Sequence, residues 1–172
     1  MSCALTSGYS LQCKDSSGGI VEVYFIEKAN VTSIVDSSGT VTGLTKAAGK
    51  RFWKYELPKE TGSLTETITG NTQNGTIFYA SELKIVINRL QVAVRNEIRL
   101  LAQNTLIAVA KDNNGDFWLI GRLNGIDLNS GTLGSGTAFG DRSGFDLTFT
   151  GSEPDPMLAV NSTVASALQT AG

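Results

Sequence analysis

The segment from Gly75 to Gly151 decides the fold: GTIFYASELKIVINRLQVAVRNEIRLLAQNTLIAVAKDNNGDFWLIGRLNGIDLNSGTLGSGTAFGDRSGFDLTFTG. Runs of β-branched and aromatic residues predict strands, and apolar residues spaced three and four apart predict a helix. Asn-Gly between two apolar runs is typical of a hairpin turn. In chain order the segment predicts strand at 76–79 and 83–87, helix at 87–103, a hairpin of 106–110 and 116–120 around 112–115, a glycine-rich loop at 131–144, and strand at 145–150.

The predicted helix has an apolar face that suits packing on a sheet. Glu97 projects within this face, and no cation lies three or four positions away to pair with it. We therefore expect Glu97 to reach solvent, to find a partner on another segment, or to meet a neighbouring subunit. Val92 lies on the polar face, either as an ordinary exposed residue or as part of an interface. The apolar face itself is formed by Leu90, Val94, Ile98 and Leu101.

Further strands are predicted before this segment, at 20–26, 31–35, 40–44, 52–57 and 63–69. After the strand at 145–150, Pro154 and Pro156 end regular pairing, and the short apolar run 157–160 precedes a weakly charged tail. We expect a domain of residues 1–151 and a C-terminal arm of residues 152–172, either disordered or docked on a neighbour. The expected fold class is α+β: an antiparallel β-sandwich or partly closed barrel with one flanking α-helix.

The composition argues against several function classes. Charged residues make up 17% of the 172 residues, below the roughly 25% of typical soluble domains. Such a surface suits either a chain that buries much of itself against neighbours or a β-rich domain with many turns. The net charge of −2 argues against nucleic-acid binding through a basic face. No stretch approaches the ~20 apolar residues of a membrane span, so no membrane partner is expected.

No catalytic residue, metal site or cofactor is expected. The chain has no histidine, which excludes histidine-based nucleophile systems and histidine-bound zinc. Cys3 and Cys13 lack the spacing of a zinc site. They either form a disulfide or stay reduced, and reduced thiols are expected because nothing at the N-terminus has the pattern of a secretion signal.

Two stretches share features with ligand-binding loops but lack the residues that binding needs. Asp112, Asn114 and Asp116 have the opening spacing of a calcium loop, yet the glycine and the terminal glutamate of such a loop are missing. The glycines of 131–144 are followed by a strand and by no lysine, which argues against a phosphate-binding loop. A flexible loop, or one ordered at an interface, is expected instead.

Asp141 and Arg142 stand side by side within the glycine-rich loop. We interpret them as a local ion pair or loop anchor rather than as a catalytic pair. The residues expected to contribute to an interface are Glu97, Val92, Thr137, Phe139, Asp141, Arg142, Met157 and Leu158.

Several stretches resemble virion structural proteins of bacteriophages, in particular the tail and ring proteins of crAss-like and related phages. The resemblance spans nearly the full length of the chain, and its motifs are structural rather than chemical. It is carried by Gly136–Gly151 (GTAFGDRSGFDLTFTG), Asn96–Asn104 (NEIRLLAQN), Ser7–Ile20 (SGYSLQCKDSSGGI) and Val23–Phe25 (VYF).

The resemblance implies a tail-tube-like fold and a non-enzymatic role. Such a subunit would associate with copies of itself into a closed ring, hexameric or dodecameric, and form part of the conduit for the genome. Neighbouring tail or neck proteins would be further partners, with transient passage of DNA through the lumen. The protein would be made and assembled in the host bacterial cytoplasm and would reside in the virion. Two alternatives remain open: a capsid-decoration or fibre-anchoring protein, and a small ligand-binding module.

Overall fold

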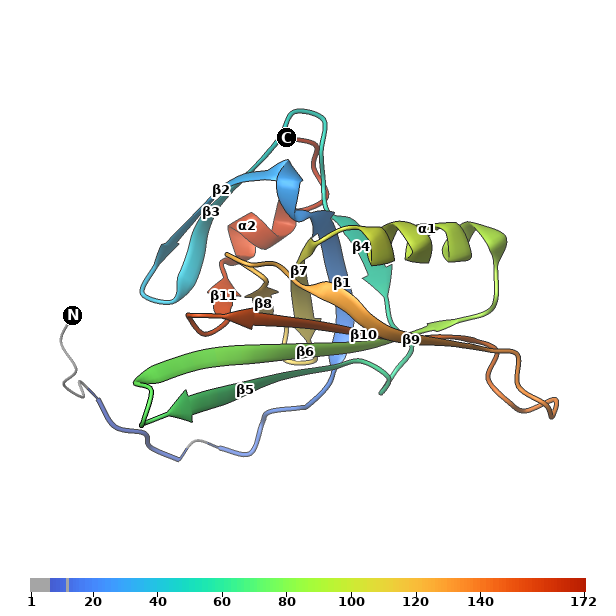
Figure 1. The fold of residues 1–172 in the computed structure, drawn as a ribbon, viewed down its shortest axis with the longest axis horizontal. Helices are drawn as coiled ribbons and strands as arrows, with labels where there is room; N and C mark the ends of the chain where they lie inside the picture. Colours follow the sequence, from blue (N-terminus) through green and yellow to red (C-terminus); the bar gives the residue numbers. More distant parts are fainter. Residues whose placement is uncertain (1–6, 12) are drawn as a thin grey trace.

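The computed structural model describes residues 7–11 and 13–172, and about half of them belong to two β-sheets (Figure 1). The larger sheet has seven strands, and all its neighbouring strands are antiparallel except β11 and β3, which are parallel. In spatial order the strands are β2 (Val31–Ser37), β3 (Thr40–Lys46), β11 (Leu158–Val160), β8 (Phe117–Ile120), β7 (Leu106–Asp112), β1 (Ile20–Glu27) and β4 (Trp53–Glu56).

The smaller sheet has four antiparallel strands, in the order β5 (Ser63–Asn71), β6 (Thr76–Asn88), β10 (Gly144–Glu153) and β9 (Asp127–Gly134). The two runs predicted at 76–79 and 83–87 form one continuous strand, β6, of 13 residues. Every residue of this strand from Tyr79 to Asn88 has a partner on β10, which explains why it does not break at Ser81–Glu82.

One hydrophobic cluster joins the two sheets, and a second covers the other face of the larger sheet. The first includes Phe25 and Ala108 from the larger sheet and Ile85, Leu147 and Phe149 from the smaller one. The second is formed by strands β1, β3, β7, β8 and β11 together with residues 52, 165 and 168. The expected β-rich α+β fold is confirmed at this level, and the two sheets do not close into a barrel.

The long helix α1 spans Val92–Gln103, so the predicted start at residue 87 is wrong. Ile87 and Asn88 continue β6 because they pair with Phe145 and Gly144. Arg89 then takes a left-handed backbone conformation (φ 72°), which turns the chain before the helix begins. Only Leu101 of α1 is buried. Glu97 is exposed, so it needs no partner within the apolar face.

The predicted glycine-rich loop at 131–144 is shorter than expected. Residues 131–134 belong to β9, and Gly144 is the first residue of β10, which leaves 135–143 as the tip of a long hairpin. Gly131 of β9 pairs with Leu147 of β10, and a Cβ at residue 131 would lie only 3.0 Å from the Leu147 side chain, which favours glycine at this position. Figure 1 shows this tip projecting beyond the rest of the molecule.

The segment after Glu153 is part of the chain's own fold rather than a free arm. Leu158–Val160 forms β11, inserted between β3 and β8. The short helix α2 (Ser162–Ser166) follows, capped by the Asn161 side chain, which accepts from the Thr163 N–H at 2.9 Å. Leu168 is almost fully buried beyond it. The expectation of a segment that is disordered or docked on a neighbour is therefore wrong for residues 158–168.

Candidate assembly surfaces

A groove lies between α1 and the edge strand β4. Its volume is about 220 Å³. Phe25, Leu101 and Leu106 of the main core form its floor, so the core is open to the surface here. Trp53 and Leu100 stand on its two sides, and they are 56% and 52% exposed. The remaining lining residues are Ile26, Glu27, Tyr55, Glu97 and Asn104.

The charged residues that line this groove are acidic. On the α1 side, the carboxylate of Glu97 faces the groove. Burial of Tyr55, together with the nearby charge of Glu97, raises the pKa of the Tyr55 hydroxyl to about 12. On the β4 side, the guanidinium of Arg51 lies 4.3 Å from the centre of the Trp53 ring, within cation–π range, but Arg51 itself does not line the groove. The groove is therefore apolar, with two carboxylates, Glu27 and Glu97, among its lining residues.

The tip of the β9–β10 hairpin has its own hydrogen bonds. The Asp141 carboxylate accepts from the backbone N–H groups of Thr137 and Ala138, each at 2.8 Å. These bonds hold the pKa of Asp141 below its ordinary value. Arg142 forms an ion pair with Asp146 at the base of the tip. Asp141 thus acts as a loop anchor, one of the two predicted roles, whereas the predicted ion pair with Arg142 is not formed, because Arg142 pairs with Asp146 instead.

Phe139 is the most exposed large apolar side chain of the part of the chain that the structure describes. It lies at the outer end of the tip. Thr137 and Ala138, which donate to Asp141, precede it in the chain, and Asp141 follows it. Thr137 is also exposed. The expectation that this stretch becomes ordered only at an interface differs from the structure, in which β9, β10 and the Asp141 contacts already define its course.

Exposed apolar side chains also gather at the opposite end of the smaller sheet, where β5 and β6 meet. Ile68, Ile77 and Phe78 are all exposed there. The turn is closed by the Asn71 side chain, which accepts from two backbone N–H groups at 3.0 and 3.1 Å. Figure 1 shows this turn and the β9–β10 tip at opposite ends of the smaller sheet.

The outer face of the smaller sheet, which points away from the core, is rich in hydroxyl groups. Successive residues of a strand point to opposite faces of the sheet. Leu64 pairs with the buried Leu83 on the inner face, so Thr65 and its cross-strand neighbours point to the outer face. A lysine and a glutamate on this face, Lys84 and Glu82, form an ion pair at 2.8 Å. The other members of this face include Ser63, Thr67, Thr69, Ser130, Thr132, Thr148, Thr150 and Ser152.

A buried carboxylate links the two sheets, and the sequence analysis did not identify it. Oε1 of Glu153 accepts from the backbone N–H groups of Leu123, Asn124 and Gly125 at 3.0, 2.8 and 3.3 Å. Its Oε2 is buried without a hydrogen-bond partner. The loop after β8 is thereby attached to the end of β10. The residues of β10 that point to the core, 145, 147 and 149, are apolar. A glutamate at the end of this alternating pattern was the only signal in the sequence for this role.

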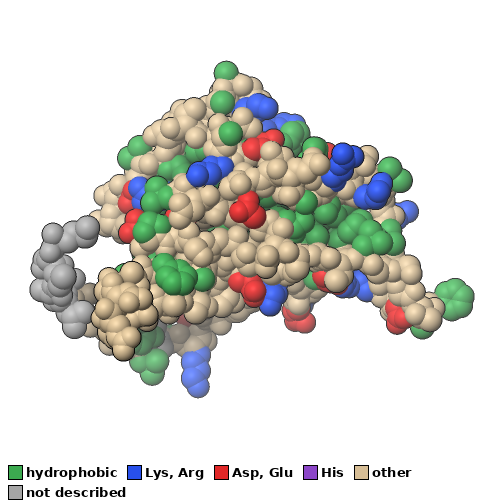
Figure 2. All heavy atoms as spheres, viewed as in Figure 1, with side chains coloured by type: hydrophobic (Ala, Val, Ile, Leu, Met, Phe, Trp, Pro, Cys, Tyr) green, Lys and Arg blue, Asp and Glu red, His purple; other side chains and the backbone are tan. Residues whose placement is uncertain are grey.

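The basic residues of α1 form a second feature outside the groove. Arg95 and Arg99 lie on the outward side of the helix, four positions apart, and Arg89 precedes them. Among the described residues no carboxylate lies within ion-pair distance of these three. Figure 2 shows basic side chains in the region of α1, with hydrophobic side chains gathered between the helix and the strands below it.

The predicted interface residues do not form one site. Glu97 lines the groove, Val92 is exposed at the start of α1, and Phe139 lies at the hairpin tip. Met157 is half-buried and donates its N–H to Glu66 at 2.9 Å. Leu158 is buried in β11, so its side chain already packs within the chain. Trp53 and Leu100 were not singled out from the sequence, although Trp53-Lys54-Tyr55 places two aromatic rings on one face of a strand.

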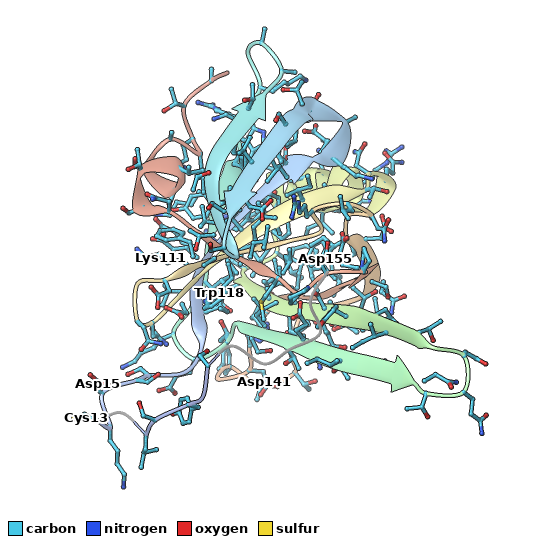
Figure 3. The ribbon with its side chains drawn as sticks, turned by 90° about the vertical axis from the view of Figure 1, so that its left-hand side faces the viewer. Cys13, Asp15, Lys111, Trp118, Asp141 and Asp155 are labelled. Carbon is cyan, nitrogen blue, oxygen red and sulfur yellow. The ribbon has the colours of Figure 1, made fainter. Side chains whose placement is uncertain are left out.

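No cluster of titratable groups suited to a metal ion occurs among residues 7–11 and 13–172. Figure 3 shows Cys13 and Asp15 on the N-terminal lead, apart from Asp141 and Asp155. Cys13 is an exposed free thiol, whereas Cys3 lies outside the described residues. Within the same described part of the chain, no helix has the length and apolar character needed to cross a membrane.

Comparison with known proteins adds no relative: no family model, no curated protein and no solved structure matches the chain.

Proposed function

We propose that the chain is a non-enzymatic structural subunit of a phage tail or neck, which assembles into a closed ring and forms part of the genome conduit. The smaller sheet is the observation that carries this proposal. It has two long edge strands, β5 and β9, and exposed apolar side chains at both of its ends. The two ends differ in sequence and shape. Contacts between unlike surfaces of identical subunits are head-to-tail, and they produce rings when the rotation closes.

The arrangement of layers is compatible with the proposed tail-tube type of fold. The two sheets share one hydrophobic cluster, and α1 lies at its flank with Leu101 inserted into it. We interpret this arrangement as a β-sandwich with one flanking helix. In that interpretation the smaller sheet is the assembly element, because its outer face and both its edges are free of other strands.

Edge pairing between subunits would supply the directional part of the contact. β5 and β9 are 9 and 8 residues long, and each exposes a row of backbone groups on its free side. Addition of β9 of one subunit to β5 of the next would continue the four-stranded sheet around the ring. The low share of charged residues, 17%, favours such burial because few charges would need to be desolvated.

The outer face of the smaller sheet is the proposed lumen surface. Its hydroxyl groups are neutral, and Lys84 is paired with Glu82. Tight binding of DNA requires several cations that neutralise phosphates. A face with little unpaired positive charge would let DNA pass without holding it. This orientation leaves α1, with Arg95 and Arg99, on the outside of the ring, toward neighbouring tail or neck proteins of the virion.

Electron microscopy of the purified chain, combined with its mass in solution, tests this proposal. We expect closed rings with a central opening, of six or twelve subunits, that increase with protein concentration. Ile77→Glu, at the end of β5–β6, should reduce the rings, because it would bury a charge at the interface. Val35→Glu, an exposed strand position on β2 of the other sheet, is the matched control and should leave them unchanged.

A chain that stays monomeric at millimolar concentration would overturn the proposal. Flat lattices or discrete non-ring oligomers would instead favour the alternative of a capsid-decoration protein, since such proteins do not close rings by themselves.

A further inference from the structure

We infer that Phe139 of one subunit inserts into the groove between α1 and β4 of a neighbouring subunit. This inference rests on the proposed self-assembly and names its contact. The occupant is the tip of the β9–β10 hairpin, residues 135–143, of a second copy. Three observations support it: the conformation of the tip, the lining of the groove, and the charges that flank each of them.

The tip presents Phe139 in an ordered way. Asp141 holds the backbone of Thr137 and Ala138, and the Asp141 N–H donates to the Ala138 carbonyl at 3.0 Å. Gly136 has a left-handed backbone (φ 70°), and a Cβ there would lie 2.5 Å from Asp141, so glycine is required at this turn. A loop that is already ordered loses little conformational entropy on binding. The exposed phenyl ring itself makes no buried contact within its own chain.

The groove supplies the surface that a phenyl ring requires. Its floor consists of core side chains, and its walls include the rings of Trp53 and Tyr55. Aromatic rings pack favourably edge to face as well as offset, and Tyr55 already makes one such contact with Phe25, at 5.3 Å and 80°. An inserted ring would cover Leu100 and Trp53, two large apolar side chains that are otherwise half exposed. Large aromatic side chains seated in such pockets provide much of the binding energy at protein interfaces.

The charges on the two surfaces are complementary. Glu97 lines the groove on its α1 side and forms no ion pair among the described residues. The tip carries Asp141 and Arg142 next to each other, two and three positions after Phe139. With Phe139 in the groove, Arg142 can face Glu97. Glu27, which also lines the groove, is engaged by the side-chain amide of Asn30 at 2.8 Å.

The ion pair that Arg142 forms within its own chain does not oppose this contact. Arg142 and Asp146 are both substantially exposed, and exposed pairs contribute little to stability. Arg142 can therefore exchange Asp146 for Glu97 or contact both. The hairpin points away from the body of its own subunit (Figure 1), which presents the tip to another molecule.

Assembly of variants measured by sedimentation velocity tests the inference. We expect Phe139→Ala to raise the concentration for half-assembly by about 30-fold or more, the effect of removing a central aromatic anchor. Arg142→Glu and Glu97→Arg should each raise it by about tenfold, and the double variant Arg142→Glu/Glu97→Arg should return to within about threefold of wild type. Arg99→Glu, a charge reversal on the outward side of α1, is the matched control and should have little effect. All four positions are exposed, so the melting temperature should not change.

A cross-linking experiment identifies the two surfaces directly. In a Cys3→Ser/Cys13→Ser background, Ala138→Cys with Leu100→Cys should give a ladder of disulfide-linked oligomers under mild oxidation. Each single cysteine should remain monomeric in denaturing electrophoresis or give dimers at most.

The outcomes separate this inference from the proposed function. Rings that form normally with Phe139→Ala and without cross-links would overturn the insertion and leave the ring proposal intact. Failure of the charge-reversed double variant to recover, with both single variants impaired, would overturn the Arg142–Glu97 contact. A wild-type chain that never assembles would overturn both proposals.

Discussion

The larger sheet is buried on both faces around β1 and β7, whereas the smaller sheet buries one face and leaves the other to solvent. Val23 and Phe25 of β1 pack toward the smaller sheet, and Tyr24 and Ile26 pack toward the second cluster. β7 is apolar and buried over five consecutive residues. In the smaller sheet, β10 instead alternates between buried apolar residues and half-buried polar ones, and the threonines of β5 are exposed. The first pattern is typical of a strand covered on both sides, and the second of a strand at a surface.

We propose that the two sheets have separate roles. Stability comes from the larger sheet and from the inner face of the smaller one, where the apolar side chains are almost fully buried. The free edges, the exposed face and the protruding hairpins of the smaller sheet add little to the core. We interpret them as surfaces retained for association. Substitutions can test the separation, because core positions should change stability and hairpin positions should change assembly.

The largest expected effect is that of Phe149→Ala in β10. Phe149 is fully buried, and its ring lies 4.8 Å from that of Phe25 on the other sheet. Truncation should lower the free energy of unfolding by about 3–5 kcal/mol, through lost burial and the cavity that remains. Urea denaturation followed by tryptophan fluorescence measures it. Phe139→Ala, the same change in the tip between β9 and β10, is the control and should leave stability within about 0.5 kcal/mol of wild type. A similar loss for both would contradict the separation.

A smaller effect is expected for Glu153→Ala, which tests the link between the two sheets. The change removes an acceptor shared by the backbone N–H groups of residues 123–125 and should cost about 1–3 kcal/mol, the penalty for leaving buried polar groups unsatisfied. Amide exchange should increase at Leu123, Asn124 and Gly125 in particular. Asp155→Ala, two positions later and exposed, is the matched control. Unchanged exchange at these amides would show that Glu153 does not hold the loop.

The smallest effect is local and concerns the pH dependence of the hairpin tip. Hydrogen bonds from Thr137 and Ala138 lower the pKa of Asp141, so the anchoring is present above the ordinary pKa and is lost as the pH falls through the lowered value. Acidification below the ordinary value of 3.8 should therefore shift the amide resonances of Thr137 and Ala138 while β10 remains intact. Asp141→Asn should abolish this titration. A shift that persists in Asp141→Asn would assign it to another group.

Local patterns in the sequence were sufficient to predict many of the elements. The hairpin of β7 and β8, the strands β1, β5 and β10, and an amphipathic helix ending at Gln103 were all predicted with small errors in their bounds. These elements have strong alternation or helical spacing, and Asn114-Gly115 defines the turn between β7 and β8. Leu101 was correctly placed in the core for the same reason.

The start of α1 could not be predicted, because apolar residues of β6 happen to continue the helical spacing backward to residue 87. Pairing with β10 holds Ile87 and Asn88 in a strand, and this pairing joins residues almost sixty positions apart. Residues 131–134 were predicted as loop since glycine and threonine carry little strand signal. Their pairing with 144–147 makes them β9.

The amino-acid sequence by itself determined the β-rich composition, the hairpins, the amphipathic helix and the lack of histidine, because each of these depends on neighbouring residues or on a simple count. Only the tertiary structure decided that Leu158–Val160 enters the larger sheet between β3 and β8, that Glu153 joins the two sheets, and that Trp53, Leu100 and Glu97 border one groove. A three-residue strand, a single carboxylate and a groove have no periodicity of their own. They arise where segments distant in the sequence pack together, and local residue spacing does not show which distant segments will be in contact.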